Sequence, residues 1–264
     1  MKLCRFIHQT FSEPRYGIIE EDFVRPLIDA DAFGSRPRIH SDKIPLSEVS
    51  LLAPVTPSKI VCVGRNYREH AAELGNPMPS EPLLFLKAPS AIIASGEAIK
   101  LPSSSVQVEH EGELGVVIGR TASRLSDAQD PLTYVLGYTC VNDVTARDLQ
   151  RKDVQFTRAK SFDTFCPVGP VIVTDINPAD IMVATRVNGE IRQSARTSAM
   201  AFSVANLLRY ISHSMTLLPG DLVITGTPAG VSVLKDGDEV EVEVEGVGVL
   251  RNTVVKITES EGKP

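Results

Sequence analysis

Residues 106–118 constrain the fold of this chain more than any other segment, because they join an acidic row to an apolar run. Glu109, Glu111 and Glu113 stand at every second position and are followed by Leu-Gly-Val-Val-Ile. Alternate side chains of a β-strand share one face, so we expect the glutamates on one face of a strand that enters a core. Adjacent buried carboxylates repel unless a positive charge lies between them. A hard divalent cation, Mg²⁺ or Mn²⁺, would supply that charge, whereas the alternative is an exposed acidic strand face.

Composition and charge are those of an ordinary globular protein. The 264 residues suit one large domain or a main domain with a small appendage. A net charge of −6 and a pI near 5.5 argue against nucleic-acid binding. The sequence contains no stretch of about 18 apolar residues, so we expect no membrane-spanning helix. The apolar stretch within residues 1–8 is too short for a signal peptide. The four cysteines lack CxxC spacing, so we expect buried, reduced thiols and a cytoplasmic location.

The pattern of apolar residues predicts a mostly β (α+β) protein with a few short helices. Two prolines in residues 53–58 mark a seam between a small N-terminal β module, residues 1–54, and a main domain, residues 55–264. The alternation of glutamate with valine in residues 239–245 predicts a half-buried strand that needs no metal. Expected strands are residues 3–7, 16–19, 23–28, 60–63, 83–86, 91–93, 106–118, 135–143, 222–225, 239–244 and 254–257, with a hairpin turn at Asn188-Gly189. Expected helices are residues 67–74, capped by Asn66, residues 145–149, capped by Thr145, and an amphipathic helix after Ser203.

Asp143 is a candidate third metal ligand. It stands where the expected strand 135–143 ends and a helix is expected to begin. Together with Glu111 and Glu113 it would form a three-ligand set that leaves about three octahedral positions for water or a chelating substrate. The alternative is that Asp143 only caps the helix.

His70 and Glu73 are candidates for acid–base chemistry. Residues three apart are neighbours on a helix face, and a carboxylate that orients an imidazole is a general-base arrangement. The alternative is an ordinary surface pair. Gly75-Asn76-Pro77, after the expected helix, indicates a mobile segment such as a lid.

Two lysines and one loop are candidates for binding an anionic substrate. Lys87 follows the apolar run Leu-Leu-Phe-Leu, and Lys160 precedes Ser-Phe-Asp-Thr-Phe-Cys-Pro. A cation in such a place can bind a carboxylate or stabilise an enolate, although a lone lysine is otherwise a solvated charge. The loop Thr225-Gly-Thr-Pro-Ala-Gly230 offers N–H groups and hydroxyls to an anion, but it lacks the ending of a phosphate-binding P-loop.

Several ordered motifs together resemble the fumarylacetoacetate hydrolase superfamily, over about residues 55–257. The motifs are Gly64-Arg-Asn-Tyr67 with His70 and Glu73, Phe85-Leu-Lys87, Glu111-Gly-Glu-Leu-Gly-Val-Val-Ile-Gly119, Asn142-Asp-Val-Thr-Ala-Arg-Asp148, Lys160-Ser-Phe-Asp-Thr-Phe-Cys-Pro-Val-Gly-Pro170, Val187-Asn-Gly-Glu190, Leu218-Pro-Gly-Asp221 and Thr225-Gly-Thr-Pro-Ala-Gly230. Two departures are a much shorter N-terminal region than in the founding hydrolase and the absence of an identifiable upstream aspartate ligand. The chain is therefore closer to the short bacterial-type members.

The resemblance implies a mixed β-roll with a metal in its mouth, usually built as a homodimer, for which residues 168–173 are a candidate interface. It implies these roles: Glu111, Glu113 and Asp143 as ligands of Mg²⁺ or Mn²⁺; His70, Glu73 and Lys160 as catalytic residues; and Arg65, Tyr67, Lys87, Gln150 and Thr227 as substrate-binding residues. The lid dyad would activate water in the acylpyruvase-like members.

The activity implied by the resemblance is a metal-dependent reaction of a small 2-oxo acid through its enolate. C–C bond cleavage is favoured, either hydrolysis of an acylpyruvate or decarboxylation of oxaloacetate. The alternative is isomerisation of 2-hydroxyhepta-2,4-diene-1,7-dioate or 5-carboxymethyl-2-hydroxymuconate in aromatic catabolism. A metal-binding protein without turnover is a remote alternative, because a scaffold needs no base such as His70 above an open coordination site.

Overall fold

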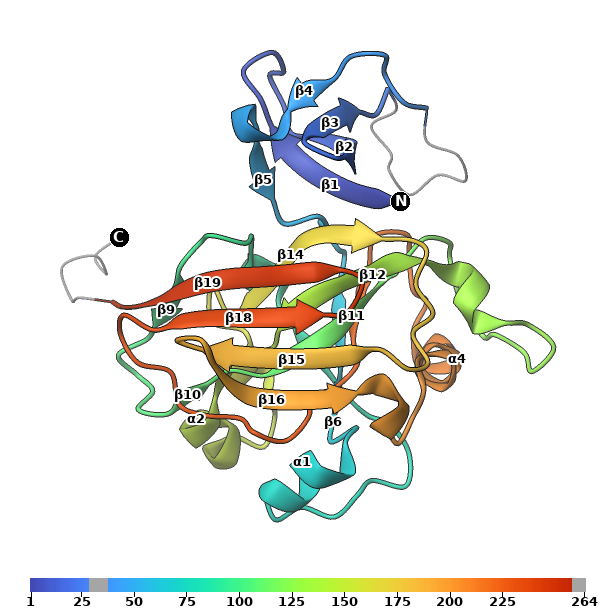
Figure 1. Ribbon diagram of the computed structural model, residues 1–264. Helices are drawn as coiled ribbons and strands as arrows, with labels where there is room; N and C mark the ends of the chain where they lie inside the picture. Colours follow the sequence, from blue (N-terminus) through green and yellow to red (C-terminus); the bar gives the residue numbers. More distant parts are fainter. Residues whose placement is uncertain (29–37, 258–264) are drawn as a thin grey trace.

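The computed structural model describes residues 1–28 and 38–257, and this part of the chain is mostly β, as predicted. Figure 1 shows a small N-terminal group of strands at one end of a larger body of packed sheets. The strands are β1 (Lys2–Ile7), β2 (Arg15–Glu20), β3 (Phe23–Pro26), β4 (Ile44–Pro45), β5 (Ser50–Leu52), β6 (Ile60–Gly64), β7 (Leu83–Lys87), β8 (Ile92–Ile93), β9 (Ile99–Leu101), β10 (Val108–Glu109), β11 (Gly112–Ile118), β12 (Val135–Asn142), β13 (Thr145–Ala146), β14 (Cys166–Val173), β15 (Met182–Val187), β16 (Glu190–Arg196), β17 (Leu222–Ile224), β18 (Glu239–Val244) and β19 (Gly248–Lys256). The helices are α1 (Arg68–Glu73), α2 (Arg147–Lys152), α3 (Thr157–Lys160) and α4 (Val204–Ser214), with 3-10 turns η1 (Leu46–Glu48), η2 (Pro89–Ala91), η3 (Pro131–Tyr134) and η4 (Thr197–Ala199).

The largest sheet runs through both parts of the molecule, in the order β4-β3-β2-β1-β14-β12-β11-β17-β6-β7. β1 of the N-terminal strands pairs with β14 of the main body, with Leu3 opposite Ile172. The seam at residues 53–58 is therefore bridged by a strand pairing. No helix in the described ranges is long and apolar enough to cross a membrane.

A second sheet, in the order β16-β15-β18-β19-β9, packs over the first and faces the viewer in Figure 1. The predicted alternation in β18 is confirmed, because Val240, Val242 and Val244 are buried while the glutamates between them are not. The predicted hairpin at Asn188-Gly189 is also confirmed. Both residues have positive φ values, 53° and 79°, as the twist of a two-residue hairpin requires.

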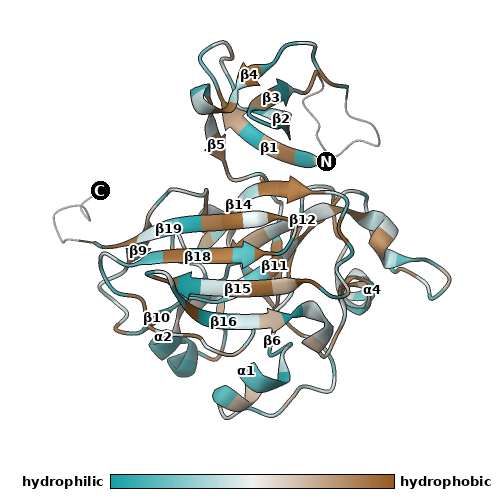
Figure 2. Cartoon of the chain, in the orientation of Figure 1, coloured by the Kyte–Doolittle hydropathy of each residue, from teal (hydrophilic) through white to brown (hydrophobic). Residues whose placement is uncertain are grey.

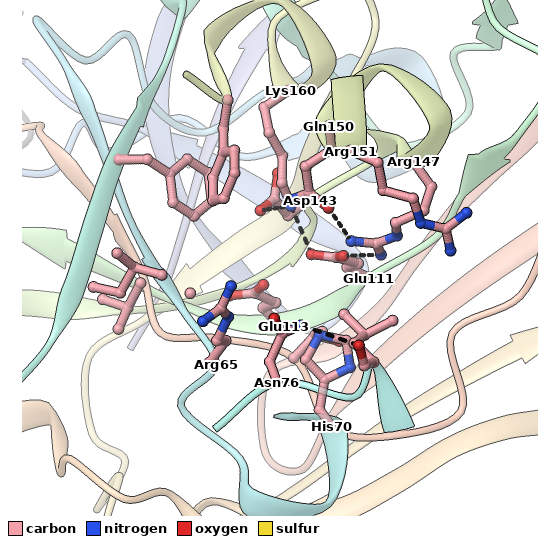
Figure 3. A pocket seen from close by; sticks show the side chains of 17 residues that line it. Arg65, His70, Asn76, Glu111, Glu113, Asp143, Arg147, Gln150, Arg151 and Lys160 are labelled. Carbon is pink, nitrogen blue, oxygen red and sulfur yellow. Dashed lines mark hydrogen bonds and ion pairs between the residues drawn. The ribbon is translucent and has the colours of Figure 1, made fainter. Parts of the chain in front are cut away.

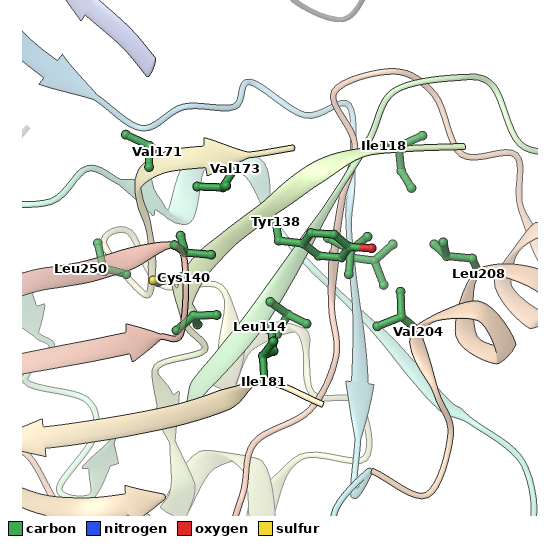
Figure 4. Packing of buried hydrophobic residues seen from close by; sticks show 14 of the residues in the cluster. Leu114, Ile118, Tyr138, Cys140, Val171, Val173, Ile181, Val204, Leu208 and Leu250 are labelled. Atoms are coloured by element: carbon green, nitrogen blue, oxygen red, sulfur yellow. The ribbon is translucent and has the colours of Figure 1, made fainter. Parts of the chain in front are cut away.

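The main hydrophobic core lies between the two sheets and extends under α4 (Figure 4). Leu114 and Ile118 of β11 enter it from the large sheet, and Leu250 of β19 enters it from the second sheet. Ser203 caps α4 as predicted, and the apolar face of that helix covers one end of the core. The other face of β11, which carries Glu113 and Val117, points away from this core.

Residues 106–118 do not form the single strand that their alternation predicts. β10 ends at Glu109 and β11 begins at Gly112, with His110 and Glu111 between them. β10 pairs with β13, whereas β11 pairs with β12 and β17. Because the chain changes partner strands at this point, the three glutamates do not form one row. A local alternation pattern carries no information about such a change of partner.

Two predicted helix caps are wrong. Helix α1 begins after Tyr67 without a side-chain cap, because the amide of Asn66 instead donates hydrogen bonds to two backbone carbonyls elsewhere. Thr145 lies in β13, and its hydroxyl donates to the backbone carbonyl of Asp143, 2.8 Å away. Both side chains therefore stabilise the irregular backbone near the carboxylates instead of a helix end.

Two further expectations have clear outcomes. The four cysteines are free and buried, as predicted, and burial raises the pKa of Cys4 and Cys166 to about 12.

The candidate interface at residues 168–173 is wrong, because β14 is an inner strand that pairs with β1 and β12. The valines of β14 are packed inside the hydrophobic cores of the same chain.

Candidate active site

A cavity of about 210 Å³ lies among the ends of β6, β7 and β11 and the helices α1, α2 and α3 (Figure 3). Its floor is charged, and α1 and α2, which border it, are largely hydrophilic (Figure 2). Its lining also includes apolar side chains, those of Val63, Leu74, Leu83, Phe85 and Phe156. Such a cavity suits a small ligand with an anionic end and a short carbon chain.

Three predicted ligands, Glu111, Glu113 and Asp143, converge on this floor. One carboxylate oxygen of each lies within 4.8 Å of the others, and all three side chains are buried. Asp143 follows the last residue of β12, and its N–H donates to the backbone carbonyl of Glu111 at 2.8 Å. Asn142 accepts from the N–H of Glu111 at 3.0 Å. The end of β12 therefore fixes the break between β10 and β11 and brings the carboxylates together.

Gly112 allows the approach of the second sheet directly between the two glutamates. A Cβ atom at this position would lie 2.0 Å from Oγ1 of Thr185 on β15. Since no real contact is that short, a side chain at residue 112 would displace the backbone that carries Glu111 and Glu113. In the Glu-Gly-Glu segment, the glycine is therefore required for packing against the second sheet, whereas the two glutamates supply the candidate ligands.

Two buried lysines neutralise part of the cluster. Nζ of Lys160 lies 2.7 Å from Oε2 of Glu111 and 2.7 Å from Oδ2 of Asp143. Nζ of Lys87 lies 2.7 Å from the other oxygen of Asp143, Oδ1. Although burial opposes its charge, the two carboxylates raise the pKa of Lys160 above its usual value. Lys160 is therefore an ammonium ion in the folded protein.

Arg147 neutralises the other side of the cluster. Its Nε lies 2.7 Å from Oε2 of Glu109, and its Nη2 donates to Oε1 of Glu111. Burial would raise the pKa of Glu111, but Lys160 and Arg147 outweigh burial and hold that pKa well below the usual value. Glu111 is therefore a carboxylate in the folded protein.

Glu113 is the one member of this cluster without a cationic partner in the described part of the chain. It accepts a hydrogen bond from the N–H of Gly226. Burial, and then the charges of Asp143 and Glu111, raise the pKa of Glu113 well above its usual value. The donor set therefore fits a divalent cation, because three buried carboxyl groups meet here and a cation beside Glu113 would favour its charged form. This cluster could bind a metal.

The predicted dyad lies beside the carboxylates. His70 is buried, and its Nδ1 lies 3.3 Å from Oε2 of Glu73. Glu73 also accepts from the N–H of Gly230, at 3.1 Å, which ties α1 to the loop that carries Thr227. The imidazole lines the cavity together with Glu111. Its place fits an acid–base role, and the mobility of the segment after α1 stays a prediction.

The five predicted substrate-binding residues fall into two groups. Arg65, Gln150 and Thr227 line the cavity, whereas Tyr67 and Lys87 lie outside its described lining. Lys87 lies behind Asp143 and is placed to orient that carboxylate. Substrate contact by these residues stays a prediction.

Two buried polar residues of the site received no role from the sequence. Arg147 belongs to the motif of residues 142–148, but nothing in a sequence shows that an arginine is buried between two glutamates. Gln193 of β16 accepts from the N–H of Gly112 at 3.0 Å and donates to the hydroxyl of Thr227 at 2.6 Å. It therefore connects the second sheet to the Glu-Gly-Glu segment, and no local sequence signal indicated this contact.

Comparison with known proteins follows the same motifs. Residues 59–255 match the family model described as fumarylacetoacetate (FAA) hydrolase C-terminal. Residues 1–54 match a second model, described as Rv2993c-like, N-terminal. A mitochondrial oxaloacetate tautomerase of Bos taurus is 46% identical over 225 residues, which cover 80% of this chain and 71% of that protein.

Solved structures agree over nearly the whole chain. The 5-carboxymethyl-2-hydroxymuconate delta-isomerase of Mycobacterium smegmatis is 42% identical, with a TM-score of 0.90 over 97% of this chain and 100% of that chain. The 2-hydroxyhepta-2,4-diene-1,7-dioate isomerase of Mycobacterium marinum is 44% identical, with a TM-score of 0.89 over 100% of both chains. The motifs, the fold and these matches agree, and the chain belongs to the fumarylacetoacetate hydrolase family of enzymes.

Proposed function

We propose that this protein is a divalent-metal-dependent enzyme that moves a proton between carbon and oxygen, or between two carbons, of a small 2-oxo acid. The observation that supports it is one cavity that contains both the three-carboxylate cluster and the buried His70–Glu73 pair. The tautomerase and the two isomerases named above carry out reactions of this class according to their names. For this reason we place proton transfer before the C–C cleavage that the sequence alone favours.

The residues of the chain have complementary parts in the proposed reaction. The imidazole of His70 takes a proton from the carbon beside the keto group, and the C–H electron pair becomes the C=C bond of the enolate. Glu73 accepts the hydrogen bond from Nδ1 and stabilises the imidazolium. Lys160 holds positive charge next to the carboxylates, near the developing oxyanion. The proton then returns to the oxygen or to a more distant carbon, so that no atom is gained or lost.

Glu111, Glu113 and Asp143 would hold the metal ion, for which we propose Mg²⁺ or Mn²⁺ because every ligand atom is an oxygen. When bound, such an ion supplies Lewis-acid stabilisation of the enolate charge. The ion also balances the charge of Glu113. The chain itself supplies the base and the surrounding cations.

C–C cleavage is the second candidate, and the same dyad supports it. His70 paired with Glu73 is a general base that can also take a proton from water. Attack of that water on a distal carbonyl would hydrolyse an acylpyruvate. A distal carboxylate in place of the carbonyl would lead to loss of CO₂ from oxaloacetate without water.

A homodimer and a cytoplasmic location complete the proposal. The four free, buried cysteines fit a reducing compartment. The dimer rests on the family alone, since the candidate interface in β14 is internal. Light scattering at micromolar concentration tests it, and a mass of 28.6 kDa, that of one chain, would count against it.

The decisive experiment follows the keto–enol equilibration of oxaloacetate by its enol absorbance, with acetylpyruvate hydrolysis and CO₂ release measured in parallel. We expect tautomerisation to be fastest, to be lost on chelation and to return with Mg²⁺ or Mn²⁺. Faster hydrolysis or decarboxylation would put the second candidate first. No turnover of any 2-oxo acid above the metal-only rate would favour a metal-binding protein without activity.

A further inference from the structure

Gln193 is a buried amide that borders the Glu-Gly-Glu segment from outside the described lining of the cavity. It lies on β16, the edge strand of the second sheet (Figure 1), and the other residues of β16 are half-buried or exposed. Its Oε1 accepts from the N–H of Gly112, 3.0 Å away, and lies 3.1 Å from Nδ1 of His110. Residues 110 and 112 are the two neighbours of Glu111 in the chain. One amide oxygen is therefore bonded on both sides of a proposed metal ligand.

The amide nitrogen of Gln193 contacts the loop of residues 225–230. Nε2 donates to Oγ1 of Thr227, at 2.6 Å, and to the backbone carbonyl of Pro228, at 2.7 Å. The hydroxyl of Thr227 in turn donates to the carbonyl of Gly112, at 3.0 Å. The orientation of the amide is unambiguous, because the N–H of Gly112 can only donate and the carbonyl of Pro228 can only accept. An apolar side chain in this place would leave both of these buried groups without their partner.

The same loop is bonded to both functional parts of the site. The N–H of Gly226 donates to Glu113, a proposed ligand, and the N–H of Gly230 donates to Glu73 of the dyad, at 3.1 Å. Both glycines have positive φ values, 102° and 105°, a region that residues with a side chain rarely adopt. A Cβ atom at Gly230 would lie 1.9 Å from the carbonyl oxygen of Arg192. The end of the loop that bonds Glu73 therefore packs directly against β16.

We propose that Gln193 is a positioning residue, which fixes the metal ligands and the His70–Glu73 pair relative to each other through the loop 225–230. The inference rests on the proposed function for the roles of those groups. This place requires an amide, because one end of the side chain must accept from the ligand segment and the other must donate to the loop. Loss of a hydrogen-bond partner behind the ligands of a metal site commonly lowers metal affinity about 10–100-fold.

Gln193→Met tests the effect on the ligands, because it keeps the length of the side chain and removes both hydrogen-bonding ends. Calorimetry with Mn²⁺ alone should show about tenfold weaker binding than in the wild type. Asn252→Leu is the matched control. Asn252 is a buried amide on β19 of the same sheet, and it donates to the backbone carbonyls of Ala94 and Glu97, each at 2.8 Å. Both variants should melt lower than the wild type, but Asn252→Leu should bind Mn²⁺ as tightly as the wild type does.

Hydrogen exchange tests the connection to the dyad without turnover. Peptides that cover α1 and the loop 225–230 should exchange faster in Gln193→Met than in the wild type, because the loop loses its attachment to β16. Asn252→Leu should leave their exchange unchanged. At saturating Mn²⁺, Gln193→Met should also lower kcat about tenfold in the wild type but less than about threefold in Glu73→Gln. A residue that acts through Glu73 has little further effect once Glu73 is replaced.

Thr227→Val is the second variant, for the case that Gln193→Met does not fold. It removes the hydroxyl between Gln193 and Gly112 with little change in shape, and it should weaken Mn²⁺ binding about threefold. Wild-type Mn²⁺ affinity in Thr227→Val would then overturn the inference.

Four results with Gln193→Met would overturn the inference. They are wild-type Mn²⁺ affinity, an equal loss of affinity in Asn252→Leu, unchanged exchange of α1, and an equal loss of kcat with and without Glu73→Gln. The outcome is separate from that of the proposed function. A protein that converts no 2-oxo acid would contradict the function, whereas Mn²⁺ binding and hydrogen exchange would still decide whether Gln193 positions these groups.

Discussion

The ammonium nitrogen of Lys160 lies 2.7 Å from Oδ2 of Asp143, in a place where neither group meets bulk water. The same nitrogen contacts Glu111, so one lysine neutralises two of the three proposed metal ligands. The cluster is therefore charge-balanced in part before any metal binds. Removal of either partner would leave a buried charge without compensation.

Lys160→Met is expected to destabilise the protein by about 3–5 kcal/mol in the absence of metal, because two buried carboxylates lose their counter-charge. Mg²⁺ should then raise the melting temperature of the variant more than that of the wild type. Arg186→Met is the control, since the partly exposed pair of Arg186 with Glu243 should contribute less than about 1 kcal/mol. Equal responses of wild type and Lys160→Met to Mg²⁺ would show that the lysine and the metal do not share these carboxylates.

Glu111→Gln and Glu113→Gln are each expected to weaken Mn²⁺ binding strongly and to abolish turnover. The reason is the loss of one of three anionic ligands to a hard cation. Elemental analysis and titration calorimetry measure the bound metal. Glu243→Gln, on the outer face of β18, should bind Mn²⁺ like the wild type. Full metal content in a variant that lacks both Glu111 and Glu113 would end the assignment.

The sequence predicted which residues form the site better than it predicted the strands and contacts that position them. It put Glu111, Glu113 and Asp143 into one set, and the structure brings them within 4.8 Å. It predicted one continuous strand for residues 106–118, because alternation is local while the switch of partner from β13 to β12 is a tertiary event. The roles of Arg147 and Gln193 were missed for a similar reason. Each depends on partners more than 30 residues away in the chain.

The His70–Glu73 pair should affect the rate of the reaction and not the affinity of the site for the metal. His70→Ala and Glu73→Gln are expected to lower kcat for tautomerisation or hydrolysis by roughly 10²–10⁴, the usual contribution of a positioned general base. Metal affinity should hardly change, since neither residue belongs to the carboxylate cluster. Decarboxylation of oxaloacetate should be less affected, because it needs no proton abstraction from carbon or water.

Glu69→Gln provides the control for the dyad, because Glu69 is an exposed carboxylate on the same short helix. It should retain wild-type rates on every substrate. If His70→Ala and Glu73→Gln also retain those rates, α1 is an ordinary surface helix. The reaction would then need a different base from the cavity.

Asp221 shows how the chain behind the site is stabilised. This buried carboxylate precedes β17 and accepts hydrogen bonds from the N–H groups of Ser58, Lys59 and Leu218 and from the hydroxyl of Ser58. Lys59 also forms an ion pair with it. Asp221 therefore joins the segment before β6 to the segment before β17, the parallel pair that leads to Arg65 and to Gly226.

The stability contributed by Asp221 should depend on pH. Burial opposes its charge, but the hydrogen bonds from Lys59, Leu218 and Ser58 outweigh burial and hold the pKa of Asp221 below its usual value. A lowered pKa means that the stabilisation is complete above the unfolded value, about 3.9, and is lost as the pH falls through the folded value. Asp221→Asn should therefore cost about 1.5–3 kcal/mol at pH 7. In urea denaturation the difference from wild type should shrink below about pH 4, and a constant difference down to pH 3 would show that packing, not charge, accounts for it.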